Sequence, residues 1–512
     1  MVSNSERIAK NVVFLYIRML VVIVVQLFTA RIVLSELGAT DYGIYNVVAG
    51  FVSMMAFFTG TMTSAVQRFF SFEIGKGNYQ KLNHYFIISL LVFAFISFAS
   101  IIILEVLGLP FINSGRMKIP IEEIDAANCV FHCSIFALVA NLLLIPYNSL
   151  IIAYEKMNVY AYISLLDVIM KLLIAFTLVM ITNSKLESYA FLIMCSTIFT
   201  TIFYIVYCKK KFRQLKYYWY WNKNMFKELM SYTGWNLIGT TASVMKSQGV
   251  NVLLSMFFSP VVNASRALAF QVNTAVDQLY TNFFSAVRPQ IVKQYANNQL
   301  QKVFSLLFSS SKLCFFLTFI ISLPFLFKTN FILSLWLGDG NVPEHACSFL
   351  YLVLIDGLIN SLGIPLISVV QATGSVKKLQ IYVGGVLLLN LPLCYLALSA
   401  GAAPELTFWI SIFLSICGIL CRLVITKELT RLSIERYIRY VLTPIFLTIA
   451  LTIAICMIIN MCIPDGIVAS LLFVILAMLI GCGLFFLLGL TKEEKYLIKG
   501  ILYKYLKYAN SK

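Results

Sequence analysis

Fourteen stretches of this chain are long and apolar enough to cross a membrane. An α-helix needs about 20 apolar residues to span a hydrocarbon core of about 30 Å. The sequence therefore predicts an all-α polytopic membrane protein with about 14 transmembrane helices. The predicted spans are residues 11–34, 43–66, 85–108, 127–151, 160–182, 188–207, 230–257, 263–287, 306–327, 347–371, 379–399, 406–426, 441–460 and 467–490.

The loops on one side of these spans are basic and those on the other side are not. The short loops 35–42, 258–262, 400–405 and 461–466 contain no Lys or Arg. Because basic loops stay on the cytoplasmic side, the pattern places both termini in the cytoplasm. In a bacterium, that membrane is the inner membrane. The basic loops carry Arg68, Lys76 and Lys81; Lys156; the run from Lys209 to Lys227; Lys293 and Lys302; Lys377 and Lys378; and Arg422 to Arg439.

Composition excludes several classes of protein. The chain is 60% hydrophobic, and the location of its basic residues accounts for the net charge of +17 better than nucleic-acid binding does. No GxxxxGK[ST] motif is present, and the segments between spans are too short for a folded catalytic domain. The twelve Cys and three His form no readable metal set. We therefore expect a transporter rather than an enzyme, with no cofactor beyond a proton or sodium gradient.

The basic, aromatic segment 208–229 divides the chain, and we expect it to lie on the inner membrane surface. The two spans on either side of GATDYGIYN have a weak sequence similarity to the two spans on either side of SPVVNASRA. This similarity suggests that the chain has two related halves. The predicted parts are a six-helix lobe (1–207), the linker (208–229), a second six-helix lobe (230–428), two appended helices (429–490) and a basic cytoplasmic tail (491–512).

Charged residues within spans are costly and usually face protein or water. Arg18, Arg31, Lys246 and Arg266 are candidates for binding a phosphate or an acidic sugar, because Arg donates bidentate hydrogen bonds to such groups. Arg18 and Arg31 have the alternative of snorkelling to the headgroups. Asp277 and Asp356 are candidates for ion coupling, and Asp356 has the alternative of pairing with Lys246 or with an Arg from another helix. Asp167 with Lys171 forms a local i,i+4 pair or a transport site.

Three spans carry polar faces. Asn46 lies on the face of 43–66, Asn236 on that of 230–257, and Asn273, Gln278 and Asn282 on those of 263–287. Such faces fit either the wall of a hydrated cavity or close helix packing through small residues, and both interpretations stay open for span 43–66. The helix 263–287 is too polar for these faces to contact lipid.

Three sequence patches carry a resemblance to a known family. They are AKNVVFLYIRMLVVIVVQLFTARIVLSELGATDYGIYNVVAGFVSM (9–54), ASRALAFQVNTAVDQLYTNFFSAVRPQIVKQYA (264–296) and LSLWLGDGNVP (333–343). Together with the number and order of the spans, they resemble bacterial Wzx-type O-antigen flippases of the multidrug/oligosaccharidyl-lipid/polysaccharide (MOP) exporter superfamily.

The resemblance implies two six-helix lobes in a V around a central cavity, plus two C-terminal helices. It implies alternating access that flips undecaprenyl-pyrophosphate-linked oligosaccharide for O-antigen, capsule or lipopolysaccharide assembly, alongside polysaccharide polymerase machinery. One alternative is a cation-coupled drug exporter of the same superfamily, which would need an acid-dominated cavity. Another is a membrane glycosyltransferase or polymerase, which would need a large acidic outer loop.

Overall fold

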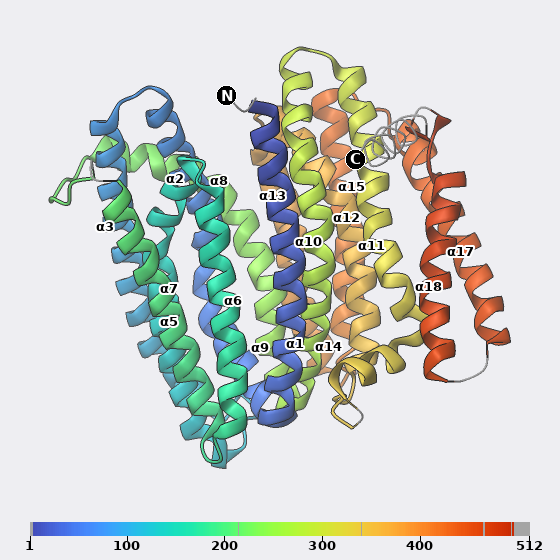
Figure 1. The fold of residues 1–512 in the computed structure, drawn as a ribbon, viewed down its shortest axis with the longest axis horizontal. Helices are drawn as coiled ribbons and strands as arrows, with labels where there is room; N and C mark the ends of the chain where they lie inside the picture. The colour runs from blue at the N-terminus through green and yellow to red at the C-terminus, as the bar shows by residue number, and fades with distance from the viewer. Residues whose placement is uncertain (1–3, 213–214, 339, 464–465, 493, 496–512) are drawn as a thin grey trace, which may run out of the picture. The chain divides into compact units, whose positions relative to one another are not determined.

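A computed structural model of the chain describes residues 4–212, 215–338, 340–463, 466–492 and 494–495. The side chains of residues 4–17, 58, 61, 64, 231–233, 235, 236, 238 and 286 lie outside this description, as does most of the predicted tail. The described chain is helical throughout its regular structure, which confirms the all-α class (Figure 1).

Eleven helices of the described residues are long and apolar enough to cross a membrane, so the chain is a multi-pass membrane protein. The predicted spans 43–66, 230–257 and 263–287 are also helical; the first begins within the candidate span Arg18–Ala56, and the other two are not among the eleven. They are the spans whose polar faces the sequence singled out.

The first two predicted spans are joined by a break at Gly38 within α1 (Asn4–Ser53). Gly38 has φ 75° and ψ 169°, a conformation that only glycine adopts without strain. The loop expected at 35–42 is thus reduced to a kink, and the second span continues through η1 (Met54–Ala56) into α2 (Phe57–Gly75).

The chain forms two compact units, each with more contacts within itself than to the other. The first comprises Met1–Gln271, Trp336–Phe349 and Gln380–Ser411, and the second comprises Val272–Leu335, Leu350–Leu379 and Ile412–Lys512. The helices α10 (Pro260–Ala296), α12 (Ala346–Ala372), α13 (Val376–Leu388) and α15 (Leu406–Thr430) each run from one unit into the other. The division into six-helix lobes stays a prediction.

In the first unit, α5 is the central helix and packs against α2, α3, α6, α7 and α1 (Figure 1). Aliphatic and aromatic side chains fill its interior, and Phe70, Phe86 and Phe131 are fully buried there. The helices of this unit not yet given are α3 (Tyr79–Ile103), η2 (Leu104–Gly108), α4 (Leu109–Asn113), η3 (Ile121–Glu123), α5 (Ile124–Ala153), α6 (Met157–Met180), α7 (Lys185–Lys211), α8 (Lys223–Val244), η4 (Met245–Gly249), α9 (Val250–Phe257) and α14 (Asn390–Ser399).

The appended helices lie side by side in the second unit, as Figure 1 shows for α17 and α18. A π-helical turn occurs at one end of each, η5 before α17 and η6 after α18. Pro444 accounts for η5, since it offers no N–H to the helix and Thr443 N instead bonds to Ile438 O, five residues back. The bounds are α11 (Leu300–Leu337), α16 (Ile434–Tyr437), η5 (Ile438–Leu442), α17 (Thr443–Cys462), α18 (Ile467–Leu484) and η6 (Phe485–Gly489).

One basic residue differs from its expected place. Arg422 was counted with a basic loop although it also falls inside the predicted span 406–426, and the structure places it inside α15, where it is buried. The apolar stretch 406–426 continues as helix to Thr430, so Arg422 precedes the helix end by two turns. Its burial depends on helix packing, which the pattern of charges along the sequence does not show.

The described part of the linker between α7 and α8, residues 215–222, is held against α3. The Asn83 side chain, 5% exposed, donates to Lys216 O and accepts from Lys216 N, each at 3.0 Å. His84 stacks on Tyr220 with ring centroids 3.8 Å apart, and Tyr85 donates to Glu228 at 2.7 Å. Asn83 and His84 of α3 therefore hold the linker, and Tyr85 holds the first part of α8. Trp219 and Trp221 of the linker stay exposed.

We expect Asn83→Leu to loosen the linker. The substitution keeps the volume but removes both hydrogen bonds to Lys216, a loss of about 1–3 kcal/mol in local stability. Trypsin should then cleave between Lys209 and Lys216 about tenfold faster in the folded, detergent-solubilised protein. The exposed Asn297→Leu is the control, and equal cleavage of both variants would contradict the role of Asn83.

Candidate functional site

Arg266 is the buried cation among the described residues of the first unit. It lies in the second turn of α10, which begins at Pro260, a residue well suited to the first turn of a helix. Arg266 is 5% exposed, donates from Nη2 to Ser247 O at 2.6 Å and places its guanidinium 4.1 Å from the centroid of the Phe270 ring. Among the described residues no carboxylate pairs with it, and its buried Nε has no partner.

A π-helical turn brings Lys246 to the same place. The turn η4 interrupts the helix formed by α8 and α9, and it contains both Lys246 and the Ser247 carbonyl that Arg266 bonds. Lys246 and Arg266 both act electrostatically on the thiol of Cys394 in α14. The structure thus brings together two of the four predicted substrate-binding cations. A buried cation without a counter-ion is an attraction point for an anion in a low-dielectric setting.

A cluster of amides joins the second part of α1 to α9 and α10. Asn251 donates to Asn46 O at 3.1 Å, and Asn263 donates to Asn251 O at 2.7 Å and to Asn251 Oδ1 at 3.0 Å. A Cβ at Gly50 would lie 2.7 Å from Gln248 Oε1, so the two helices touch there. Asn46 therefore lies at a tight packing contact, which agrees with the helix-packing interpretation of its span.

Arg18 and the Asp167–Lys171 pair lie together on the contact of α1 with α6. Arg18 Nε is 2.5 Å from Ser164 Oγ, and the guanidinium lies 4.7 Å from the Tyr160 ring centroid. Lys171 Nζ is 2.8 Å from Asp167, one helical turn away. These contacts tie Arg18 to α6 rather than to the surroundings of Arg266.

Arg31 is exposed near the Gly38 break. Its Nη2 is 3.9 Å from where a Cβ at Gly338 would stand, and Trp336 Nε1 donates to Leu27 O at 2.9 Å. The patch 333–343 therefore packs on the same part of α1 that the first patch covers. Asn236 is helical in α8, but its side chain lies outside the described part of the structure.

The second unit gathers the two predicted coupling acids. Asn273 donates to Asp277 Oδ2 at 2.9 Å, and Ser415 is 2.5 Å from Asp356 Oδ1. Asp277 interacts with Tyr280 and electrostatically with Asp356, and among the described residues its buried Oδ1 has no geometrically defined hydrogen-bond partner. Gln278 and Asn282 follow on α10 and are half-buried.

Arg422 completes this second cluster, and the sequence did not predict it there. Its guanidinium is buried, its Nε has no hydrogen-bond partner in the described part of the chain, and Asp356 lies within electrostatic range. Gly363 makes room for it, since a Cβ there would lie 2.6 Å from Nη1. Two carboxylates and one guanidinium near an unsatisfied oxygen form a place where a proton or a small cation would change the charge balance.

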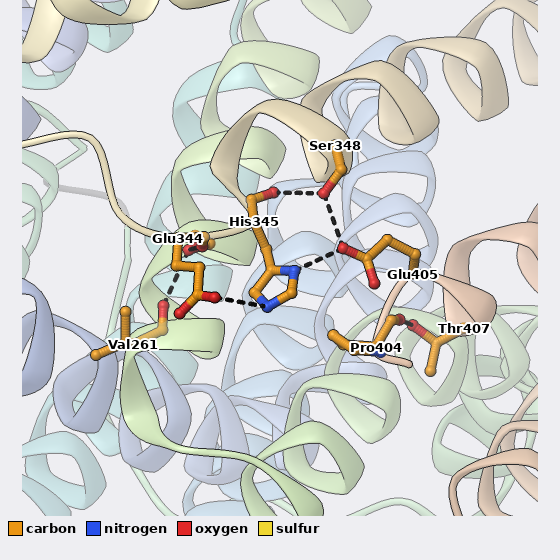
Figure 2. Close-up of polar contacts among 8 residues, drawn as sticks. Val261, Glu344, His345, Ser348, Pro404, Glu405 and Thr407 are labelled. Atoms are coloured by element: carbon orange, nitrogen blue, oxygen red, sulfur yellow. Dashed lines mark hydrogen bonds and ion pairs between the residues drawn. The ribbon is translucent and has the colours of Figure 1, made fainter. Parts of the chain in front are cut away.

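A third polar group, shown in Figure 2, was not predicted. His345 has a left-handed backbone (φ 66°), and its Nδ1 lies 2.6 Å from Glu405 Oε1, which also accepts from Ser348 Oγ at 2.9 Å. Glu344 Oε1 is 3.9 Å from the other ring nitrogen. Burial raises the pKa of Glu405, but the hydrogen bonds from His345 and Ser348 outweigh it and lower the pKa below 4.5.

Comparison with known proteins identifies the fold. The family model MatE matches residues 15–177. The solved structure of a lipid II flippase MurJ in an inward closed conformation is similar with a TM-score of 0.69 and 15% identity, over 93% of this chain and 98% of that one. No curated protein matches the sequence.

Two MATE transporters are similar over a smaller share of this chain. An inward-facing multidrug resistance MATE family transporter of the MOP superfamily has a TM-score of 0.62 and 15% identity, over 83% of this chain and 99% of that one. A eukaryotic MATE transporter has a TM-score of 0.62 and 14% identity, over 84% and 99%. The chain therefore has the fold of MOP-superfamily transporters.

The lowered pKa of Glu405 predicts a pH-dependent contribution to stability. A carboxylate whose pKa falls on folding stabilises the fold above its ordinary pKa, and that stabilisation is lost as the pH drops through the folded value. Glu405→Gln should therefore lower the midpoint of thermal unfolding at pH 7, and the difference from the parent should shrink below pH 4.5.

Glu344→Gln is the matched control, because Glu344 approaches the same imidazole but is 84% exposed. A pH-independent difference for Glu405→Gln, or an equal effect of the control, would contradict the assignment.

Proposed function

We propose that this protein flips undecaprenyl-pyrophosphate-linked oligosaccharide across the bacterial inner membrane by alternating access, for the assembly of O-antigen, capsule or another surface polysaccharide. The observation that carries the proposal is Arg266, a buried guanidinium in a membrane-spanning helix with no described carboxylate beside it. A structural cation would be expected to have a counter-ion.

The chemistry of the substrate fits this cation. A pyrophosphate carries two or more negative charges and presents oxygens that a guanidinium binds in a bidentate manner. Lys246 adds a second positive charge nearby, and both interactions strengthen where water is excluded. Arg18 and Arg31 remain candidates for later contacts along the path of the substrate.

The extent of the structural similarity also supports a lipid-linked substrate. The match to the lipid II flippase leaves 7% of this chain uncovered, fewer residues than the appended pair contains, so that match includes part of the pair. The matches to the MATE transporters leave enough residues uncovered to omit it. A helix pair beyond the twelve-helix exporter core suits a substrate with a long lipid tail.

Coupling to an ion gradient is the second part of the proposal. Asp277 and Asp356 in the second unit would take up a proton or Na⁺, with the unsatisfied Asp277 Oδ1 as the acceptor. This same cluster is the observation that favours the runner-up, a cation-coupled exporter of small cationic drugs. The two functions differ in what Arg266 does, since a cationic drug gains nothing from it.

Arg266→Met should separate function from stability. Removal of an uncompensated buried charge should leave the unfolding temperature unchanged or higher, whereas loss of phosphate binding should lower flipping at least tenfold, which corresponds to about 1.4 kcal/mol. In a host that lacks the chromosomal gene, the variant should leave undecaprenyl-linked units in the cytoplasmic leaflet and no surface glycan. Arg266→Lys should retain part of the activity.

The exposed Arg116→Met is the control for a lost positive charge. Normal surface glycan with Arg266→Met would overturn the role of Arg266. Unchanged glycan together with increased sensitivity to cationic drugs on deletion of the gene would favour the exporter.

Asp277→Asn should uncouple transport from the driving ion. The amide keeps the shape but cannot take up a proton or hold Na⁺ by charge, so an imposed gradient should no longer accelerate flipping in proteoliposomes. Asn282→Asp, on the same helix, is a control that adds rather than removes a carboxylate. An undiminished response of Asp277→Asn to both proton and Na⁺ gradients would rule out this residue.

A further inference from the structure

A cavity of about 1230 Å³ lies in the second unit, apart from the residues proposed for transport. The first turns of α11, the segment that carries α16 and η5, and the residues after η6 form its walls. It is lined by Gln301, Phe304, Ser305, Phe308, Ser309, Lys312, Arg431, Leu432, Ser433, Glu435, Arg436, Arg439, Tyr440, Thr491, Lys492 and Glu494.

The lining is strongly basic. It contains five Lys and Arg side chains against two Glu side chains. One acid is already neutralised, because Lys312 Nζ lies 2.6 Å from Glu494, which also accepts from Ser309. These contacts outweigh burial and lower the pKa of Glu494. Four cations then face Glu435 alone.

Lys312 is a buried lining residue of the cavity that its contacts hold in place. It is 1% exposed, and besides Glu494 it bonds the Gly489 carbonyl at 3.1 Å, at the end of η6. Phe308 stacks on Tyr440 with centroids 6.0 Å apart and contacts Tyr437 edge-on at 6.1 Å. The wall is thus preorganised by one ion pair and an aromatic group rather than by the arginines themselves.

The arginines point to a ligand. Within the described chain, the guanidinium groups of Arg431, Arg436 and Arg439 make no hydrogen bond or ion pair. Arg431 also holds a left-handed backbone (φ 61°) at the end of α15, where its N–H bonds Lys427 O at 2.8 Å. Glycine is the residue favoured at such a helix end, so the arginine occupies this position at a conformational cost.

The surroundings indicate that the ligand has a lipid tail. The cavity lies at the basic ends of membrane helices, where anionic headgroups of the facing leaflet concentrate. Within a few residues of the lining along the chain, Phe446 and Leu447 at the start of α17, and Leu487 and Leu488 in η6, expose apolar side chains. The second unit therefore carries both a basic cavity and exposed apolar side chains on the segments that form it.

We propose that this cavity binds the phosphate-bearing headgroup of an anionic phospholipid from the leaflet that faces the basic loops. Arg431, Arg436 and Arg439 bind the phosphate oxygens, and the acyl chains lie along the exposed sides of η5 and η6. The net charge of the lining, +3, favours a headgroup with two phosphates over one with a single charge. The proposal is independent of the transported substrate.

The test compares lipid binding by the full-length protein with that of Arg436→Gln/Arg439→Gln. The purified protein is titrated with cardiolipin, phosphatidylethanolamine or inorganic phosphate, and bound lipid is counted by native mass spectrometry. At about 1 kcal/mol per Arg near a membrane surface, cardiolipin affinity should fall about tenfold or more in the double variant. Phosphatidylethanolamine should bind weakly to both proteins.

Lys293→Gln/Lys302→Gln is the matched control, with the same loss of charge at exposed positions of the same unit outside the lining. An equal loss of binding in this control, or unchanged cardiolipin binding in the Arg variant, would overturn the proposal. Binding of inorganic phosphate as tightly as cardiolipin would assign the cavity to a soluble phosphate compound instead. If the double variant does not fold, Arg436→Gln alone provides the comparison, since that side chain is exposed.

Discussion

The interior of a membrane offers no water, so every polar group that enters it must find a partner within the protein. Most of this chain meets that requirement locally: helices satisfy the backbone, Asp167 neutralises Lys171, and the amides of Asn46, Asn251 and Asn263 join helices through one another's backbone and side-chain oxygens. Arg266 departs from it. Its contacts are a carbonyl and an aromatic face, which orient a guanidinium without neutralising it. The proposed function rests on this difference.

Hydropathy and loop charge were enough to predict the helices, because a span must be long and apolar whatever its neighbours are. The same criteria could not place Arg422, which lies close enough to the end of an apolar stretch for either a loop or a buried position to agree with the pattern. Nor could they reduce the loop at 35–42 to a single break, since that depends on the backbone angles of Gly38.

The residue types of the candidate site were predictable, but their grouping was not. A face drawn at 3.6 residues per turn runs continuously along residues 230–257, whereas η4 inserts an extra residue and rotates everything after it by about 100°. Lys246 lies in that turn, so its position relative to Arg266 and to α14 followed only from the structure. The contact of His345 with Glu405 depended in turn on a left-handed backbone that no pattern in the sequence signals.

The attachment of the linker has a consequence for how this segment can evolve. The Asn83 side chain bonds the backbone N–H and C=O of Lys216 and not its side chain. Hydrogen bonds to the main chain do not depend on the side chains of the neighbouring residues. The basic and aromatic residues of the linker can therefore change during evolution while the path of its backbone stays the same. Among homologues, a small amide at position 83 would then be a better marker of this route than any motif within the linker itself.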